Sequence, residues 1–132
     1  MSGTSSRKGD AGAVKWWGWG LKSKTYRLDD KPQFWPYLLK TLKLAQLNER
    51  PRVTLEDVEL PPPRLDGRTL ARLERVIGSA DVSTTKHDRL THSLGKSYVD
   101  LLTLRRGIIR NPPDAVAYPR NEKEVAKLLS FA

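Results

Sequence analysis

The chain of 132 residues contains no cysteine, which excludes disulfide bonds, thiolate metal sites and cysteine nucleophiles. It has only two histidines, and no apolar run approaches the roughly 18 residues that indicate a membrane-spanning helix. Residues 1–12 are small and polar and lack the apolar segment of a secretory signal. These absences favour a soluble cytoplasmic protein. The apolar fraction of 38% is enough for one modest core.

Positive charge is in excess, because 24 Lys+Arg side chains against 15 Asp+Glu give a formal charge of +9. Such a balance favours acidic partners, namely nucleic acid, anionic lipid headgroups or phosphorylated substrates. The basic residues are spread over both halves of the chain and form no basic tail. We therefore interpret them as a generally basic, solvated surface, since a dedicated nucleic-acid stripe would be more clustered.

The N-terminal third divides into a leader, a tryptophan cluster and a helix. Residues 1–13 are rich in Ser, Gly and charge, which predicts a flexible leader. Residues 15–20 (Lys-Trp-Trp-Gly-Trp-Gly) hold three of the four tryptophans. Such rings could stack on bases or enter a lipid interface, but packing of the N-terminal segment across the domain is the favoured role. Residues 32–47 are predicted to be a helix, with Pro36 in its first turn. Its apolar face is Phe34, Leu38, Leu42 and Ala45.

In the middle of the chain, residues 53–60 alternate weakly and run into three prolines, which predicts an extended segment at a sheet edge. A helix is predicted from an N-cap at Asp66 to Gly78. Its apolar face is Leu70, Leu73 and Ile77, and its solvated face is Arg68, Arg72 and Arg75. Residues 83–92 are polar and could hold a short helix. A further apolar stripe begins at Tyr98, Leu101 and Leu102 and stops at Gly107.

The C-terminal segment has the pattern of a strand, a turn and a helix. Residues 115–118 read as a short buried strand between prolines. Asn121 is predicted to cap a helix, with Glu124 three residues on. Its apolar face is Val125, Leu128, Leu129 and Ala132. This pattern is the first half of a βαβ unit, and a parallel strand needs a crossover partner. We therefore expect an incomplete folding unit; the alternative is a small α+β domain in which the strand pairs with residues 53–60.

No local motif for catalysis is visible. His87 and His92 are five residues apart, which does not place them on one helix face as a two-His metal site requires. Asp88 next to His87 is a weak signal for a catalytic pair, and local hydrogen bonding is the favoured role. Residues 18–20 (Gly-Trp-Gly) do not form a phosphate loop, because the remaining glycines and the following helix are missing. We predict no catalytic and no metal-binding residue.

Two segments together resemble a known family. Residues 15–20 resemble the Lys-Trp-x-Gly-Trp-Gly signature near the start of alkyldihydroxyacetone-phosphate synthases. The segment from about residue 86 to 132 is similar to a second stretch of that family, and its C-terminal part is shared by many FAD-linked oxidases with the vanillyl-alcohol-oxidase-type flavin domain. The matching residues are Asp88-Arg89, Gly95, Leu104-Arg105, Gly107, Pro113-Asp114, Val116 and Pro119.

The resemblance implies an α+β fold, with a mostly helical region at 14–109 and the start of an FAD-binding (PCMH-type) α/β domain at 110–132. It implies FAD as the cofactor of the full-length protein. The implied reaction exchanges the acyl chain of acyl-dihydroxyacetone phosphate for a fatty alcohol and forms the ether bond of ether lipids. Pro119 alone is carried over as a cofactor-binding residue, because the family's pyrophosphate loop, tyrosine and histidines lie further along. Arg89 and Arg105 match family arginines, for which we expect structural salt bridges.

Two other functions stay open. A generic FAD-linked oxidase or dehydrogenase of hydroxy acids or alcohols would share the same flavin domain. A self-sufficient basic module would bind nucleic acid or an anionic membrane, with an affinity that falls steeply with salt. The expected partner is a phosphorylated lipid precursor or a small-molecule substrate, with no specific nucleic acid. Peripheral membrane contact and a homodimer are left open.

Overall fold

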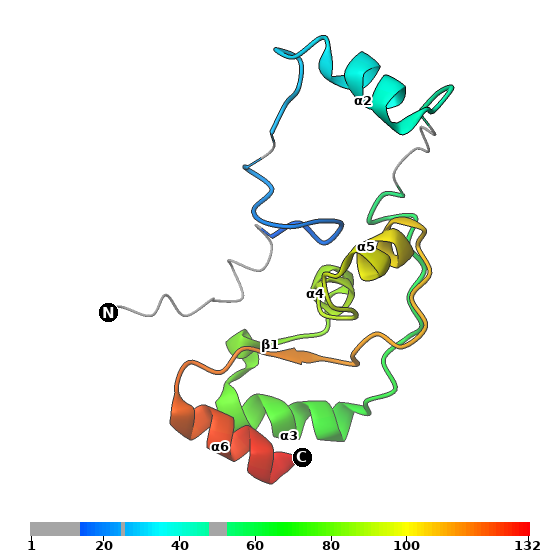
Figure 1. Cartoon of the computed structure of the whole chain (residues 1–132). Coiled ribbons are helices and arrows are strands. Elements are labelled where there is room, and N and C mark those ends of the chain that lie inside the picture. Colours follow the sequence, from blue (N-terminus) through cyan, green and yellow to red (C-terminus); the bar gives the residue numbers. More distant parts are fainter. Residues whose placement is uncertain (1–13, 25, 48–52) are drawn as a thin grey trace.

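The computed structural model describes residues 14–24, 26–47 and 53–132, so the predicted leader at 1–13 lies outside the described residues. The described part combines helices with one small antiparallel sheet, which confirms the predicted α+β class (Figure 1). Its elements are α2 (Phe34–Leu42), α3 (Gly67–Ile77), the 3-10 turn η1 (Ser79–Asp81), β1 (Val82–Ser83), α4 (Lys86–Thr91), α5 (Tyr98–Arg105), β2 (Val116–Ala117) and α6 (Glu122–Phe131).

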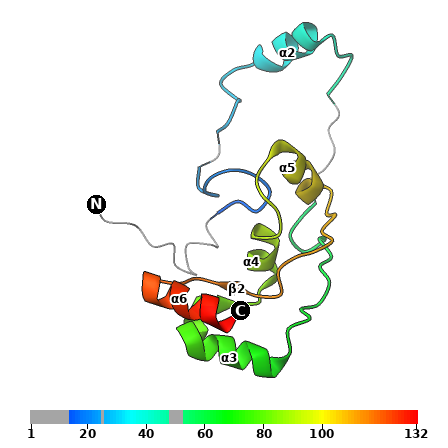
Figure 2. The same cartoon turned by 60° about the horizontal axis from the view of Figure 1, so that its bottom comes forward.

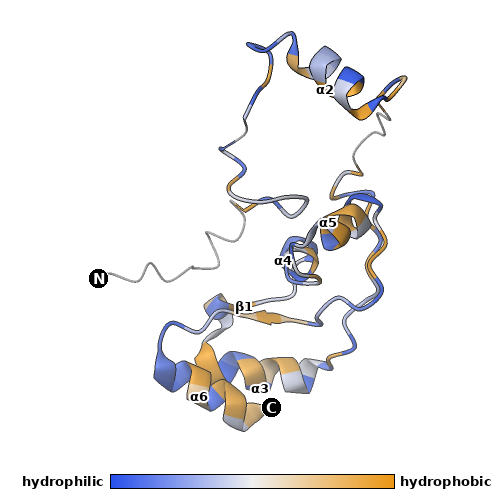
Figure 3. Ribbon diagram, viewed as in Figure 1, coloured by the Kyte–Doolittle hydropathy of each residue, from blue (hydrophilic) through white to orange (hydrophobic). Residues whose placement is uncertain are grey.

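Helices α3 and α6 pack against each other beside the sheet at one end of the molecule, as both views show (Figures 1 and 2). Both helices carry apolar stretches (Figure 3), and their contact encloses a small core around Leu73, Ile77 and Val82. Helix α3 has the predicted limits. The Asp66 carboxylate accepts a hydrogen bond from the backbone N–H of Thr69 at 2.7 Å, and Gly78 ends the helix with φ 96°, a conformation that favours glycine.

The strand predicted at 115–118 forms at Val116–Ala117, and it has a neighbour that the sequence analysis did not name. β2 pairs antiparallel with β1, which puts Val82 opposite Ala117 and Ser83 opposite Val116. The backbone N–H of Tyr118 also donates to the carbonyl of Asp81 at 2.9 Å. The alternative pairing with residues 53–60 is therefore wrong, whereas the expectation of a parallel crossover partner is not tested by this pairing and stays a prediction. Because β1 follows α3 and β2 precedes α6, the packing of the two helices brings the two strands together.

Residues 53–60 form a turn where an edge strand was expected. The Thr54 hydroxyl donates to the Asp57 carboxylate at 2.7 Å, and Val58 is fully buried. Val58 joins a second core with Leu90 of α4 and Leu104 of α5. Val53, Leu55 and Leu60 pack against the same core, so the apolar residues of this segment are buried by a turn rather than by a strand face.

Helix α2 is shorter than predicted and has no buried residue. Pro36 lies in its first turn, as expected, and Lys43 ends it in the left-handed conformation at φ 53°. The helix therefore stops before Ala45, and its apolar face is not covered by the rest of the described chain. Both views place α2 far from α3 and α6 (Figures 1 and 2).

The remaining predicted helices form, but their buried faces are rotated in part. In α5, Leu101 and Leu104 are buried while Tyr98 is 71% exposed. In α6, Leu128 and Phe131 pack against α3, whereas Val125 and Leu129 of its predicted face are 43% and 75% exposed. Arg72 was expected on the solvated side of α3, but its guanidinium lies 5.3 Å from the centre of the Phe131 ring.

Candidate functional site

The tryptophan cluster forms a loop that packs on α5. An isolated bridge between Val14 and Leu21 closes the loop. Trp16 is 4% exposed and belongs to the core that includes Leu101 and Leu104. Trp17 packs edge-on against it with ring centres 5.7 Å apart. These contacts confirm that packing is a role of the cluster.

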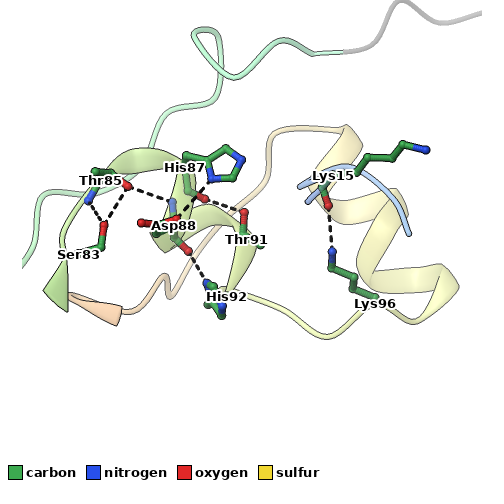
Figure 4. A network of polar contacts seen from close by, with 8 residues as sticks. All are labelled: Lys15, Ser83, Thr85, His87, Asp88, Thr91, His92 and Lys96. Atoms are coloured by element: carbon green, nitrogen blue, oxygen red, sulfur yellow. Dashed lines mark hydrogen bonds and ion pairs between the residues drawn. The ribbon is translucent and has the colours of Figure 1, made fainter. Parts of the chain in front are cut away.

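Two basic side chains hold the tryptophan loop through its carbonyl groups. The Lys96 ammonium donates to the carbonyl of Lys15 at 2.9 Å (Figure 4) and to the carbonyl of Gly18 at 3.2 Å, and burial lowers the pKa of this ammonium. The indole of Trp19 donates back to the Lys96 carbonyl at 2.9 Å. Arg105 Nε donates to the carbonyl of Trp17 at 3.1 Å, so this arginine bonds a carbonyl where a salt bridge was expected.

An open cleft of about 670 Å³ lies along the outer side of this loop. Aromatic rings and basic groups share its lining, a combination that suits an anion with an apolar part. The lining contains no histidine and no carboxylate, so it offers no general acid or base of those kinds. It consists of Lys15, Trp17, Gly18, Trp19, Gly20, Leu21, Lys24, Tyr26 and Arg105.

A second polar cluster surrounds Asp88 on α4 (Figure 4). Asp88 is 5% exposed. Burial by itself would raise the pKa of its carboxyl, but hydrogen bonds from Ser83, Thr85 and His87 outweigh burial and lower that pKa. The Thr85 hydroxyl also accepts from the Asp88 backbone N–H at 3.2 Å and so caps α4. The carboxylate therefore holds the start of α4 against β1.

The two histidines bond locally, as expected. His87 Nδ1 lies 3.5 Å from Asp88 Oδ1, and His92 Nδ1 lies 2.9 Å from the Asp88 carbonyl. His92 packs edge-on against Tyr118 with ring centres 5.8 Å apart. No group of three or more His, Cys, Asp or Glu in the described ranges could hold a metal ion.

Tyr118 follows β2 directly and lies close to the Asp88 carboxylate. Burial, together with the nearby Asp88 carboxylate, raises the pKa of its hydroxyl to about 12. The hydroxyl is buried without a hydrogen-bond partner, as is Nε2 of His87. The raised pKa keeps the Tyr118 hydroxyl protonated well above neutral pH.

Arg89, the second family-matched arginine, links two proline-containing segments. It is 5% exposed. Its Nε donates to the carbonyl of Pro113 at 2.7 Å, and its Nη2 donates to the carbonyl of Pro61 at 2.8 Å. The expected salt bridge is replaced by two charge-assisted hydrogen bonds to backbone carbonyls. Sequence spacing offers no signal for this link.

Pro119, the one predicted cofactor-binding residue, lies between β2 and α6 and is partly buried. The N-terminus of α6 that follows it is already occupied by its own side chains. Asn121 accepts from the backbone N–H of Glu124 at 3.0 Å, and the Glu124 carboxylate accepts from the backbone N–H of Arg120 at 2.7 Å. These two hydrogen bonds use the backbone N–H groups of Arg120 and Glu124 at the start of α6. The role of Pro119 stays a prediction.

Comparison with known proteins gives a consistent result. No family model matches the chain. It is 33% identical to Protein Rv2250A of Mycobacterium tuberculosis, over 80% of this chain and 69% of that protein. It is 31% identical to the alkyldihydroxyacetonephosphate synthase of Trypanosoma brucei brucei over 90% of this chain, and 30% identical to that of Dictyostelium discoideum over 65%.

Solved structures match the fold as well. Two crystal forms of alkyldihydroxyacetonephosphate synthase superpose with TM-scores of 0.79 and 0.78 at 25% identity, over 92% and 100% of this chain. The fold thus matches a segment of these larger solved structures. The chain belongs to one family with Protein Rv2250A and the alkyldihydroxyacetonephosphate synthases. It spans 22% and 14% of the two curated synthases and 26% and 27% of the solved ones.

Proposed function

We propose that the chain is the N-terminal part of an FAD-dependent alkyldihydroxyacetonephosphate synthase. The whole enzyme would exchange the acyl chain of a phosphorylated lipid precursor, acyl-dihydroxyacetone phosphate, for a fatty alcohol. The observation that supports this proposal best is the 31% identity to a curated synthase across 90% of the chain. It is supported further by the structural similarity over the whole chain.

In this proposal the 132 residues provide structure rather than chemistry. The tryptophan loop and the Asp88 cluster hold α4 and α5, and Arg89 connects them to the segment that leads into β2. The unit β2–α6 would open the flavin domain, whose remaining parts would bind FAD. FAD would supply a covalent attachment point for the lipid precursor, while this chain positions the first strand and helix beside it.

The test is an exchange assay on the gene product, including any sequence that continues past Ala132. With acyl-dihydroxyacetone phosphate and a labelled long-chain alcohol, we expect labelled alkyl product, released fatty acid and no dye reduction. A flavoprotein that reduces a dye with hydroxy acids and forms no ether would support the oxidase alternative. Stoichiometric yellow flavin on the 132 residues alone would contradict the proposal that they are only part of the flavin-binding unit.

No helix in the described ranges is long and apolar enough to cross a membrane. We further propose that the enzyme is cytoplasmic and that it forms a homodimer. It would contact the membrane surface peripherally, and it would not bind a specific nucleic acid. Gel filtration of the whole product with light scattering tests the dimer. Retention on heparin that exceeds retention on a plain cation exchanger would contradict the absence of nucleic-acid binding.

A further inference from the structure

A small cavity lies where two proline-containing segments meet. Segments 61–64 and 110–114 border it, and they run side by side between α5 and α3 (Figure 1). The backbone N–H of Arg64 donates to the Asp114 carboxylate at 3.0 Å and joins the two segments. The cavity has a volume of about 110 Å³, which is room for about three to four waters. It therefore fits a compact group and is too small for a nucleotide or an acyl chain.

The lining of this cavity is positively charged. Three arginines line it, namely Arg64, Arg89 and Arg110. Within the described ranges, the lining contains a single carboxylate, that of Asp114, and Arg64 Nε lies 3.8 Å from it. Three positive charges against one negative charge leave the lining with a net charge of +2.

Arg89 is the arginine of this lining that is buried without a counter-ion. It is 5% exposed, and none of the ion pairs among the described residues includes it. Its bonds to the carbonyls of Pro61 and Pro113 use two of the five guanidinium N–H donors. The other three belong to a charged group that borders the cavity. Burying a charge costs least when an opposite charge pairs with it, so the cavity favours an anion.

We propose that this cavity binds a phosphate group, either free phosphate or the end of a phosphate monoester. Arg89 donates to it from the buried side, and the exposed Arg64 and Arg110 close the cavity from the solvent side. Guanidinium groups bind phosphate through paired N–H···O bonds. Phosphate carries a charge of about −1.5 to −2 at neutral pH, which balances the lining better than the single charge of a carboxylate. The site does not depend on the proposed exchange reaction.

The test is phosphorus nuclear magnetic resonance of inorganic phosphate titrated with the chain, at an ionic strength held constant with sodium chloride. We expect the phosphate resonance to broaden and shift until the site is saturated. Arg110→Gln and Arg64→Gln each remove one exposed guanidinium and should weaken binding about five-fold. The matched control is Arg75→Gln, because Arg75 is exposed in the last turn of α3 whereas Arg64 precedes the first turn. It should change binding by less than about two-fold.

A further variant changes the site in the opposite direction. Asp114→Asn removes the carboxylate of the described lining but keeps an oxygen that can accept from the backbone N–H of Arg64. It should therefore tighten phosphate binding about three-fold. Asp29→Asn removes the same charge from an exposed ion pair with Arg27 and should leave phosphate binding unchanged. All these variants keep Arg89, so the link between the two segments stays in place.

Methyl phosphate distinguishes the two sources of the phosphate group. Displacement of inorganic phosphate by a similar concentration of methyl phosphate would assign the site to phosphate monoesters, and no displacement would assign it to free phosphate. Both results support the proposal.

Three results would overturn the proposal. The absence of saturable broadening would show that the cavity binds no phosphate. Equal weakening by Arg75→Gln and Arg110→Gln would show a general effect of surface charge. Phosphate binding by the chain but not by the longer gene product would show that other polypeptide fills the cavity. None of these outcomes bears on the exchange assay, so the two proposals fail separately.

Discussion

Replacing Arg89 tests how the chain is held together between its two cores. Its guanidinium donates to the carbonyls of Pro61 and Pro113 at 2.8 and 2.7 Å while it is 5% exposed. Hydrogen bonds from a charged donor contribute about 1.5–3 kcal/mol each. Arg89→Met keeps much of the apolar stem but removes both donors, so we expect a loss of about 3–5 kcal/mol in the free energy of unfolding. Arg89→Lys can reach one carbonyl at a time and should lose about half as much.

The assay is urea denaturation followed by far-ultraviolet circular dichroism and tryptophan fluorescence. With a slope of about 2 kcal/mol/M, Arg89→Met should lower the midpoint by about 1.5–2.5 M. The control is Arg68→Met, because Arg68 is exposed on α3 and should change stability by less than about 0.5 kcal/mol. If Arg89→Met stays within about 1 kcal/mol of the parent at an unchanged slope, water replaces the guanidinium and the link does not stabilise the fold.

Three further predictions concern other parts of the structure. Because the pKa of Tyr118 is raised to about 12, the unfolded tyrosine ionises first; stability should be full below pH 10 and fall between pH 10 and 12, and Tyr118→Phe should abolish both that fall and the late step in the ultraviolet difference titration. Lys96→Met removes the ammonium that binds the tryptophan loop, so it should shift tryptophan emission to longer wavelength, whereas Lys40→Met should not. Identical emission spectra of the Lys96→Met and parent proteins would contradict the loop contacts. Gly107→Ala should destabilise by about 1 kcal/mol because φ is 69°, while Gly67→Ala, with open space around it, should stabilise slightly, and thermal melts with the same sign for both would refute the backbone argument.

Local signals predicted the helix limits well where a cap or a glycine defines them. Asp66 and Gly78 bound α3, and Asn121 begins α6, because capping depends on a few neighbouring atoms and a positive φ on a single residue. The start of α5 has a reciprocal capping box between Ser97 and Asp100. We did not predict it, although the serine three residues before an acid was a visible signal.

Sequence reasoning identified residues of the candidate site but did not identify their contacts. The family resemblance singled out the tryptophan cluster and both matched arginines. Their hydrogen bonds to backbone carbonyls depend on segments 24 to 88 positions away in the chain. No local pattern indicates such distant acceptors. For Lys96, which bonds across 81 positions, nothing in the neighbouring residues indicates its role.

The amino-acid sequence by itself determined which segments become helices, which family the chain resembles and that residues 116 and 117 are extended. Only the tertiary structure decided the partner of β2, because strand pairing depends on how α3 and α6 pack and not on the strand's own residues. It also decided that α2 stands uncovered. Amphipathic spacing indicates that a face is apolar, but only the arrangement of the other elements determines whether anything covers it.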